Sequence, residues 1–322
     1  MRSINISVVI PVKNGFPEIK HCIDGILMQT ILPKKIVVID SGSEDNTIHY
    51  LREIPLVQIV QIPSQEFNHG ETRNLGLNFV DSEFVYFTVQ DAKASDKHLF
   101  ENLLEPFLDE SVAGVCGKQI VEHTTETNPV EWYRPQTNNK IKKFKFESEI
   151  SFNNASPKEK NEACSWDDVN AMYRVSVLKK IRFKKVVFGE DMLWAKDAYC
   201  NGFSLVYQES AHVYHYHLEN PQYTFKRSFT TQYFRFVNFN FIYDTPQMTL
   251  KDHFKILRTI FISLGFKPYS IAQWYFYNFR QFKATLKAYN FFNEKLSAGI
   301  KDLHLSHEKL CSQAPSPLKR FL

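Results

Sequence analysis

The first 110 residues alternate short apolar runs with segments of helical character, and no other feature of the sequence limits the fold as strongly. Residues 6–11, 35–40 and 56–62 are rich in Ile and Val, which indicates buried strands. Residues 17–29 carry apolar side chains at helical spacing, and residues 71–80 are also predicted to be helical. Strands that alternate with helices predict an α/β domain with a mostly parallel, doubly wound sheet.

The next run, residues 84–92, reads Phe-Val-Tyr-Phe-Thr-Val-Gln-Asp-Ala and contains no charge before Asp91. We expect one buried strand that ends close to this carboxylate, in the place where α/β sheets bind ligands. One aspartate, together with phosphate oxygens and water, is enough to bind Mg²⁺ or Mn²⁺, so Asp91 is our candidate metal ligand. The alternative interpretation is that Asp91 caps a helix that begins near Ala94.

Two further clusters fall at an expected strand end and an expected helix start. Asp40 ends the second strand, where its carboxylate can accept the imide N–H of a uracil or thymine ring, or simply close a turn. His69, Gly70 and Arg73 lie at the start of a predicted helix. A glycine there permits close backbone approach to a ligand, and the arginine fork suits phosphate. The alternative is an ordinary loop with a solvated arginine.

The segment Gly189-Glu190-Asp191 introduces another predicted helix. An acid at a helix start beneath a site is suited to act as general base toward a hydroxyl. His215 and His217 follow about 25 residues later, in a predicted strand where both side chains point to the same face and either can reach the metal. A lone histidine more often has a structural role, and a pair at a strand end shifts that balance only modestly.

Taken in order, these clusters resemble the inverting family 2 glycosyltransferases with the GT-A fold, over residues 5–220. The matching segments are Val9-Ile10-Pro11-Val12-Lys13-Asn14, Asp40-Ser41-Gly42-Ser43 and Phe188-Gly189-Glu190-Asp191-Met192-Leu193-Trp194. Residues 67–74, followed by Thr88-Val89-Gln90-Asp91-Ala92, are most similar to bacterial rhamnosyltransferases that build surface polysaccharides.

This resemblance implies transfer of L-rhamnose from dTDP-L-rhamnose to a saccharide hydroxyl by an inverting single displacement, in O-antigen, capsule or cell-wall polysaccharide synthesis. It makes Asp191 the catalytic base and places Glu190 and Trp194 in support near the acceptor, which is an oligosaccharide or is lipid-linked. The residues implied in binding the nucleotide-sugar donor are Pro11, Lys13, Asp40, His69, Gly70, Arg73, Gln90 and Asp91. The metal ligands implied are Asp91 and His215, with His217 as a further candidate.

One position departs from the family pattern. The usual metal motif of the wider family is Asp-x-Asp, and here Val89 occupies the earlier position. Gln90 can contact the diphosphate, the ribose or a metal-bound water, but it brings no charge. The metal is therefore expected to depend on donor phosphates and on a histidine.

The composition limits which cellular compartment the protein is expected in and which classes of molecule it is expected to bind. A net charge of +4 indicates ordinary solubility and does not call for nucleic acid. The five cysteines are scattered without a C-x-x-C motif, which argues for a reducing compartment and against a disulfide framework or a zinc knuckle. The charge-free apolar stretches at 259–266 and 268–279 are shorter than a bilayer requires, so we expect a cytoplasmic protein, with peripheral membrane attachment left open.

The remaining segments predict the domain organisation. Residues 124–161 are polar and suggest a long excursion with little regular structure, a candidate mobile loop over the site. Residues 1–220 form the expected catalytic domain, and residues 221–322 form an aromatic-rich helical region with interleaved Lys and Arg. These helices fit either a membrane surface or packing on the catalytic domain or a second subunit.

Rival functions are a glycosyltransferase with another UDP- or dTDP-sugar, a sugar nucleotidyltransferase, and a non-catalytic partner subunit. A nucleotidyltransferase should have a glycine-rich loop after its first strand, whereas residues 11–15 contain one glycine. The absence of an acid at Val89 favours a non-catalytic subunit, and the intact segment at 189–191 opposes it.

Overall fold

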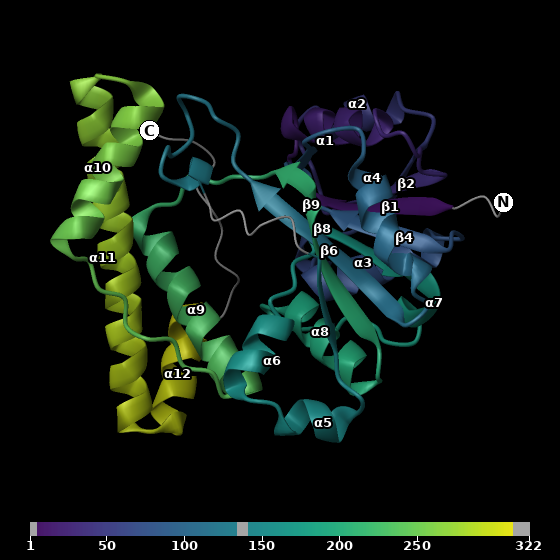
Figure 1. Cartoon of the computed structure of the whole chain (residues 1–322). Coiled ribbons are helices and arrows are strands. Elements are labelled where there is room, and N and C mark those ends of the chain that lie inside the picture. Colours follow the sequence, from purple (N-terminus) through teal and green to yellow (C-terminus); the bar gives the residue numbers. More distant parts are fainter. Residues whose placement is uncertain (1–4, 134–140, 312–322) are drawn as a thin grey trace. The chain divides into compact units, whose positions relative to one another are not determined.

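The computed structural model describes residues 5–133 and 141–311 and is drawn in Figure 1. The strands are β1 (Ile6–Val12), β2 (Lys35–Asp40), β3 (Val57–Gln61), β4 (Phe84–Thr88), β5 (Lys93–Ala94), β6 (Val112–Ile120), β7 (Lys142–Lys145), β8 (Asn170–Arg174) and β9 (Ser204–Tyr214). The α-helices are α1 (Glu18–Leu27), α2 (Thr47–Arg52), α3 (His69–Gly76), α4 (Leu99–Leu104), α5 (Glu149–Asn154), α6 (Pro157–Ala163), α7 (Val175–Leu178), α8 (Glu190–Cys200), α9 (Pro221–Phe239), α10 (Leu250–Leu264), α11 (Pro268–Ala298) and α12 (Ile300–Cys311). Short 3-10 turns are η1 (Ser64–Glu66), η2 (Leu77–Phe79), η3 (Glu105–Leu108) and η4 (Glu131–Tyr133).

The described strands form one sheet in the order β3-β2-β1-β4-β8-β6-β9-β5, and β7 pairs with β9 outside this path. β1 pairs in parallel with β2 and β4, and β2 pairs in parallel with β3, so the first four strands are parallel as predicted. β8 runs antiparallel to both β4 and β6, and β6 is parallel to β9. The sheet as a whole is therefore mixed, with a parallel half built from the first 90 residues.

Helices cover both faces of the parallel half. Alternate β1 residues, such as Ile6 and Val8, share one buried cluster with Ile23 of α1 and Phe100 of α4. Val9 points to the opposite face, where α3 lies so close that a Cβ added at Gly76 would come within 2.5 Å of the Val9 side chain. Strands β1, β2 and β4 are buried on both faces and have continuous apolar sequences, which is why they were recognisable, whereas the edge strand β3 is only partly buried.

The prediction for residues 124–161 is wrong for most of the described part of that segment. It contains β7, α5 and α6, and residues 134–140 lie outside the described residues, so the expectation of a mobile loop there is not addressed. The two helices begin at serine caps: the side chain of Ser148 accepts from the Ser151 N–H, and that of Ser156 accepts from the Glu159 N–H. A polar segment thus becomes helical because each short helix has a cap and needs to bury only one apolar stripe.

The chain divides into two compact units, one comprising Met1–Ile120 and Gln136–His215, the other comprising Val121–Pro135 and Tyr216–Leu322. The domain bounds expected from the sequence, 1–220 and 221–322, stay a prediction. The sequence did not indicate that residues 121–135 belong with the C-terminal helices. Within that second unit, the side-chain amide of Asn128 exchanges hydrogen bonds of 2.9 and 3.0 Å with that of Asn278 on α11.

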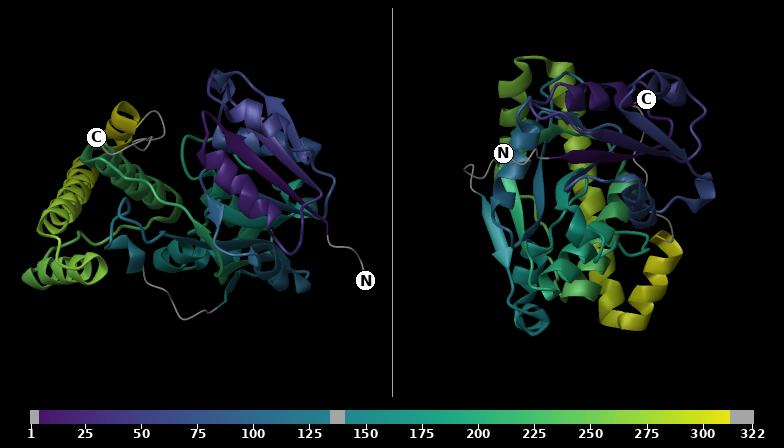
Figure 2. Two further views of the ribbon diagram at one scale, coloured as in Figure 1. Left: turned by 90° about the horizontal axis from the view of Figure 1, so that it is seen from above. Right: turned by 90° about the vertical axis from the view of Figure 1, so that its right-hand side faces the viewer.

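The second unit is helical in its C-terminal part, and Figure 2 shows its helices from two further directions. α9, α11 and α12 enclose a small apolar core made by Phe229, Ala288, Phe292 and Leu303. α10 packs along α11. Within residues 5–133 and 141–311, no helix is both long enough and apolar enough to cross a membrane.

Candidate functional site

A two-residue strand brings Asp91 to the end of the sheet. After β4 the chain turns, and β5 pairs antiparallel with the end of β9, with Lys93 opposite Tyr214. Asp91 precedes Lys93 by two residues, and His215 directly follows Tyr214. The pairing therefore explains why a carboxylate and two imidazoles meet although they are more than 120 residues apart.

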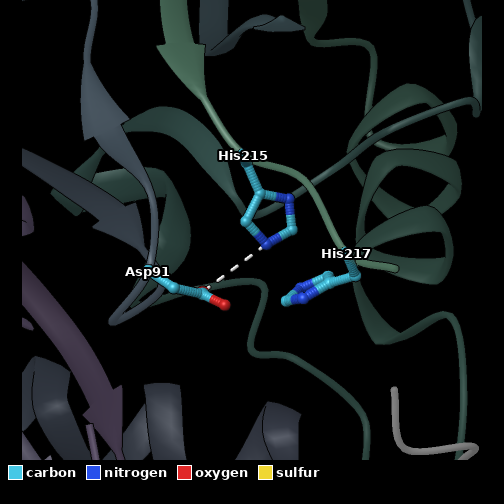
Figure 3. A group of neighbouring side chains, drawn as sticks. All are labelled: Asp91, His215 and His217. Carbon is cyan, nitrogen blue, oxygen red and sulfur yellow. Dashed lines mark ion pairs between the residues drawn. The ribbon is translucent and has the colours of Figure 1, made fainter. Parts of the chain in front are cut away.

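The three side chains form a group that can hold a metal ion (Figure 3). One ligand atom from each of Asp91, His215 and His217 lies within 4.8 Å of the other two. His215 Nε2 is 3.5 Å from Asp91 Oδ1, and both side chains are partly exposed. The sequence placed both histidines on a strand, which is wrong, because β9 ends at Tyr214; they approach Asp91 from the segment that follows it.

The chemistry of this donor set fits a divalent transition metal. One carboxylate oxygen and two imidazole nitrogens suit Mn²⁺ better than Mg²⁺, which prefers oxygen ligands throughout. Three protein ligands would also leave coordination positions for phosphate oxygens. The two histidines would thus supply the ligands that Val89 does not, and of the two expected cations Mn²⁺ matches these donors better.

A chain of hydrogen bonds runs from His215 to a second group of acidic side chains. This group consists of Asp167, Asp168, Glu190 and Asp191. His215 Nδ1 lies 2.6 Å from Gln119 Oε1 on β6, and Gln119 Nε2 donates to Asp167 Oδ2. The other oxygen of Asp167 accepts from the Val169 N–H at 2.8 Å. Gln119 and Asp167 both escaped the sequence analysis, because a polar residue in a strand and an aspartate in a turn carry no recognisable motif.

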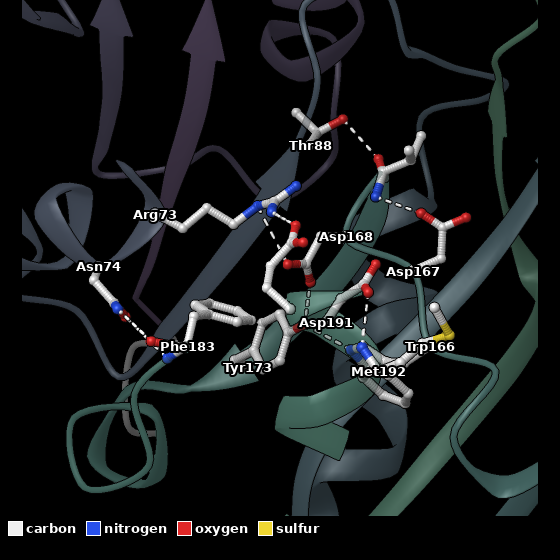
Figure 4. A network of polar contacts seen from close by, with 12 residues as sticks. Arg73, Asn74, Thr88, Trp166, Asp167, Asp168, Tyr173, Phe183, Asp191 and Met192 are labelled. Atoms are coloured by element: carbon white, nitrogen blue, oxygen red, sulfur yellow. Dashed lines mark hydrogen bonds and ion pairs between the residues drawn. The ribbon is translucent and has the colours of Figure 1, made fainter. Parts of the chain in front are cut away.

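The second group surrounds the start of α8 (Figure 4). Gly189 precedes this helix at φ 78°, a left-handed conformation that favours glycine, and Glu190 and Asp191 occupy the first turn. The main-chain N–H of Met192 donates to Asp191 Oδ1 at 2.7 Å. Asp191 is partly exposed, whereas Glu190 is buried.

Arg73 lies buried between two of the acids. Its Nε is 3.2 Å from Asp168 Oδ2, and its Nη1 donates to Glu190. Asp168 also accepts from the hydroxyl of Tyr173. Arg73 is 4% exposed, so its guanidinium neutralises these carboxylates and is not displayed as a fork for phosphate, contrary to the role expected from the sequence.

The single positive charge of Arg73 cannot neutralise all four acidic side chains of this group, and the pKa values of three of them are shifted as a result. Loss of hydration raises the pKa of Asp191 well above its ordinary value, and the charges of Glu190, Asp168 and Asp167 raise it further. Burial raises the pKa of Asp168 to about 6, against the attraction of Arg73. Burial also acts to raise the pKa of Glu190, but Arg73 and then His69 outweigh it, so that pKa is lowered.

Two residues expected at the donor instead hold the protein together. A Cβ at Gly70 would lie 2.5 Å from the Lys184 carbonyl oxygen, so this glycine permits α3 to pack against the segment before α8. Gln90 Oε1 accepts from the Lys13 N–H at 2.8 Å, and Gln90 Nε2 donates to the Lys13 carbonyl at 3.3 Å. Gln90 therefore holds the loop that follows β1, and Lys13 extends to Ser64 Oγ.

Asp40 and Pro11 lie at the carboxyl ends of neighbouring strands, as expected. The Asp40 carboxylate accepts from the N–H groups of Gly42 and Ser43 at 3.1–3.3 Å and has no exposed surface. This is the turn-closing arrangement, and base recognition by this carboxylate would require that turn to open. His69, at the first position of α3, contacts Phe67 edge-on and is half-buried.

Trp194 belongs to the protein interior. Its Nε1 donates to the Ile181 carbonyl at 2.9 Å, and its ring packs edge-on against Tyr173 with centroids 4.6 Å apart. Trp194 is buried, as is Glu190, so both support the site from behind and neither presents a surface to an acceptor. Asp168 was missed in the sequence because its partner Arg73 is nearly 100 residues away, and Tyr173 was missed because its role follows from its hydrogen bond to Asp168.

The chain matches known proteins at the level of sequence. Residues 7–182 match the family described as "Glycosyl transferase family 2". The chain is 30% identical over 236 residues to the O-antigen chain rhamnosyltransferase RfbN of Salmonella typhimurium, covering 72% of each chain. It is 32% identical over 213 residues to the O-antigen chain rhamnosyltransferase WbaN of Salmonella anatum, covering 65% of each chain.

Solved structures extend the likeness to the fold alone. The mannosyltransferase PcManGT from Pyrobaculum calidifontis, solved with GDP-Man and Mn²⁺, superposes with a TM-score of 0.55 at 16% identity, covering 97% of this chain and 81% of that one. Residues 1–349 of TarS from S. aureus, solved with UDP-GlcNAc, give a TM-score of 0.52 at 14% identity, covering 90% of this chain and 92% of that one. The chain therefore belongs to glycosyl transferase family 2 and has the GT-A fold that its sequence predicts.

Proposed function

We propose that this protein transfers L-rhamnose from dTDP-L-rhamnose to a hydroxyl of a saccharide acceptor, by an inverting single displacement, in the synthesis of a surface polysaccharide. The observation that carries the chemistry is Asp191, a partly exposed carboxylate of raised pKa within the same unit as Asp91 and His215. The sugar is supported by the two relatives whose names describe them as rhamnosyltransferases.

Asp191 acts as the general base in this proposal. Its Oδ1 accepts from the Met192 N–H, and Oδ2 has no hydrogen-bond partner within residues 5–133 and 141–311, which leaves Oδ2 for the proton of an acceptor hydroxyl. A carboxylate of raised pKa is a stronger base than an ordinary one, which favours proton removal. Asp168 and Glu190, paired with Arg73, keep the surroundings of Asp191 negative.

The donor lies across the carboxyl ends of β1, β2 and β4 in this proposal, where Pro11, Lys13 and Asp91 are found. Lys13 is exposed and its ammonium is suited to a phosphate oxygen. Asp91, His215 and His217 would hold the divalent cation. When bound, that cation neutralises charge on the leaving diphosphate.

The test is a donor screen with two variants. Purified protein should release dTDP from dTDP-L-rhamnose faster than nucleoside diphosphate from UDP- or GDP-sugars, and transfer should require an acceptor glycan. Asp191→Asn should lower kcat by about 10²–10⁴-fold, the usual value of general-base help, with nucleotide affinity little changed. Turnover by this variant like that of the native protein would remove Asp191 from the role. Release from no nucleotide-sugar at all would favour a non-catalytic partner subunit.

We also propose that α10 and the start of α11 rest on an anionic membrane surface, where a lipid-linked acceptor would be held. Phe254 on α10 is 72% exposed and Phe266 after it is 79% exposed, and Leu250 and Phe261 are exposed on the same helix. Residues 253–293 contain six Lys and Arg and no Asp or Glu. Exposed aromatics beside basic side chains match a helix that lies in the headgroup region.

Flotation with liposomes tests this contact. The full-length protein should float with phosphatidylglycerol vesicles at low salt, float less at high salt, and stay unbound with phosphatidylcholine alone. The double variant Phe254→Ser/Phe261→Ser should lose binding, while Leu108→Ser, which changes an even more exposed apolar side chain in the first unit, should not. A native protein that stays unbound, or a double variant that instead dissociates a dimer in light scattering, would contradict the membrane assignment.

A further inference from the structure

We propose that Gln119 is a positioning residue that fixes His215 for metal binding and at the same time orients Asp167, whose charge acts on the base Asp191. This inference rests on the proposed function, because it concerns the same metal and the same base. Gln119 lies near the end of β6, in register with Val213 of β9, so a rigid strand pair holds its side chain. The amide oxygen Oε1 of Gln119 faces the imidazole of His215, and the amide nitrogen Nε2 faces the carboxylate of Asp167.

The direction of the amide determines the tautomer of His215. An ionised carboxylate only accepts hydrogen bonds, so Asp167 requires the NH₂ of Gln119, and the amide oxygen must then face the imidazole. Gln119 Oε1 is 2.6 Å from His215 Nδ1, so this nitrogen donates and carries the hydrogen. The lone pair is left on Nε2, the atom that faces Asp91 at 3.5 Å.

A histidine that binds a metal usually donates its other ring N–H to a hydrogen-bond acceptor, which fixes the orientation and the basicity of the imidazole. Loss of that acceptor typically lowers metal affinity by about 10–100-fold. The same amide prevents rotation of the Asp167 carboxylate, which the Val169 N–H holds from its other oxygen. Asp167 in turn contributes negative charge at Asp191. One side chain thus connects His215 to Asp167 through two hydrogen bonds, and Asp167 acts on the base Asp191 through its charge.

Two variants separate these connections. Gln119→Leu has nearly the same size and removes both hydrogen bonds. Gln119→Glu keeps an acceptor toward His215 but replaces the donor toward Asp167 by a like charge. Gln58→Leu is the matched control, since Gln58 is a partly exposed glutamine on β3 of the same sheet and makes no such bridge to any of the described residues.

Mn²⁺ binding to the full-length proteins is measured by electron paramagnetic resonance, without nucleotide and with dTDP. We expect Gln119→Leu to weaken Mn²⁺ binding by about 10–100-fold, and Gln58→Leu to match the native protein. Gln119→Glu should bind Mn²⁺ within a few-fold of the native protein but lose kcat with KM for the donor little changed. Nitrogen-15 chemical shifts of His215 in the metal-free native protein should show the hydrogen on Nδ1.

The outcomes distinguish this inference from the proposed function. If the native protein transfers sugar and binds Mn²⁺ and Gln119→Leu does both equally well, Gln119 has no positioning role and the proposed function stands. If the native protein transfers sugar without binding Mn²⁺, both the metal assignment and this inference fail. A hydrogen found on Nε2 of His215 would overturn the inference even if Gln119→Leu does not fold.

Discussion

Replacing Arg73 by methionine should lower the free energy of unfolding by about 3–5 kcal/mol near pH 8, the range found when one partner of a buried ion pair is removed. Arg73 is 4% exposed, and its Nε lies 3.2 Å from Asp168 Oδ2. At an effective dielectric constant of about 20, that contact alone is worth about 5 kcal/mol before desolvation. The contact with Glu190 adds to this value, and the dehydration of all three groups offsets a large part of the sum.

The loss in free energy of unfolding caused by Arg73→Met, its stability deficit, should grow as the pH rises. The pKa of Asp168 is raised from its ordinary 3.8 to about 6, so its contribution to stability is present below about pH 4 and is lost as the pH rises through 6. Without the charge of Arg73, the pKa values of Asp168 and Glu190 should rise further. Folded Arg73→Met must therefore ionise two unpaired carboxylates as the pH rises, whereas at low pH both are neutral.

Urea unfolding at pH 5 and pH 8 measures both effects, since differences between variant and native protein cancel the general acid sensitivity of the chain. Arg52→Met is the control: Arg52 is exposed at the end of α2, and its loss should change stability by less than about 0.5 kcal/mol. A deficit for Arg73→Met below about 1 kcal/mol at pH 8, or an equal deficit at both pH values, would refute the assignment of Arg73 as the cation of a buried acid cluster.

Three other perturbations follow from the site. Gly70→Ala should cost about 1–3 kcal/mol in thermal or urea unfolding, because its Cβ would press on the Lys184 carbonyl, and an unchanged midpoint would contradict that packing. The kcat profile should fall on its acid side at a pH above the ordinary 3.8 of an aspartate, because Asp191 must lose its proton and its pKa is raised; an acid limb near pH 4 would contradict this. Asp91→Asn should weaken dTDP binding in the presence of Mn²⁺ and leave the metal-free affinity nearly unchanged in calorimetry, whereas equal losses with and without Mn²⁺ would place Asp91 on the nucleotide itself.

Three strands of the parallel half, β1, β2 and β4, were predictable because they are buried on both faces and so have continuous apolar sequences. β7, by contrast, reads Lys-Lys-Phe-Lys, an exposed strand whose charges conceal it. The helix at Pro157–Ala163 was recoverable in principle from Ser156 followed by proline and Glu159, a start signal that outweighs polar composition. Local sequence thus determined the elements that bury most surface and left the exposed ones ambiguous.

The residues of the candidate site also fall into those that local sequence reveals and those whose role depends on distant partners. Asp91 and Asp191 were recognisable because each follows a strand or begins a helix. Arg73 was recognised but misassigned, because its role depends on Asp168, which the fold brings to it from nearly 100 residues away. Gln119 could not be found from sequence for the same reason, since both its partners come from other elements.

The pairing of β5 with β9 also sets the order in which this enzyme can mature. Asp91 leaves the ribosome more than 120 residues before His215, and β9 is the last strand of the sheet to be synthesised. A nascent chain that has not yet delivered β9 lacks both histidines and the strand against which β5 aligns. Binding of a divalent cation by all three side chains would therefore report that β9 and the segment after it have been delivered, which would make Mn²⁺ a useful probe of late folding as well as of the proposed site.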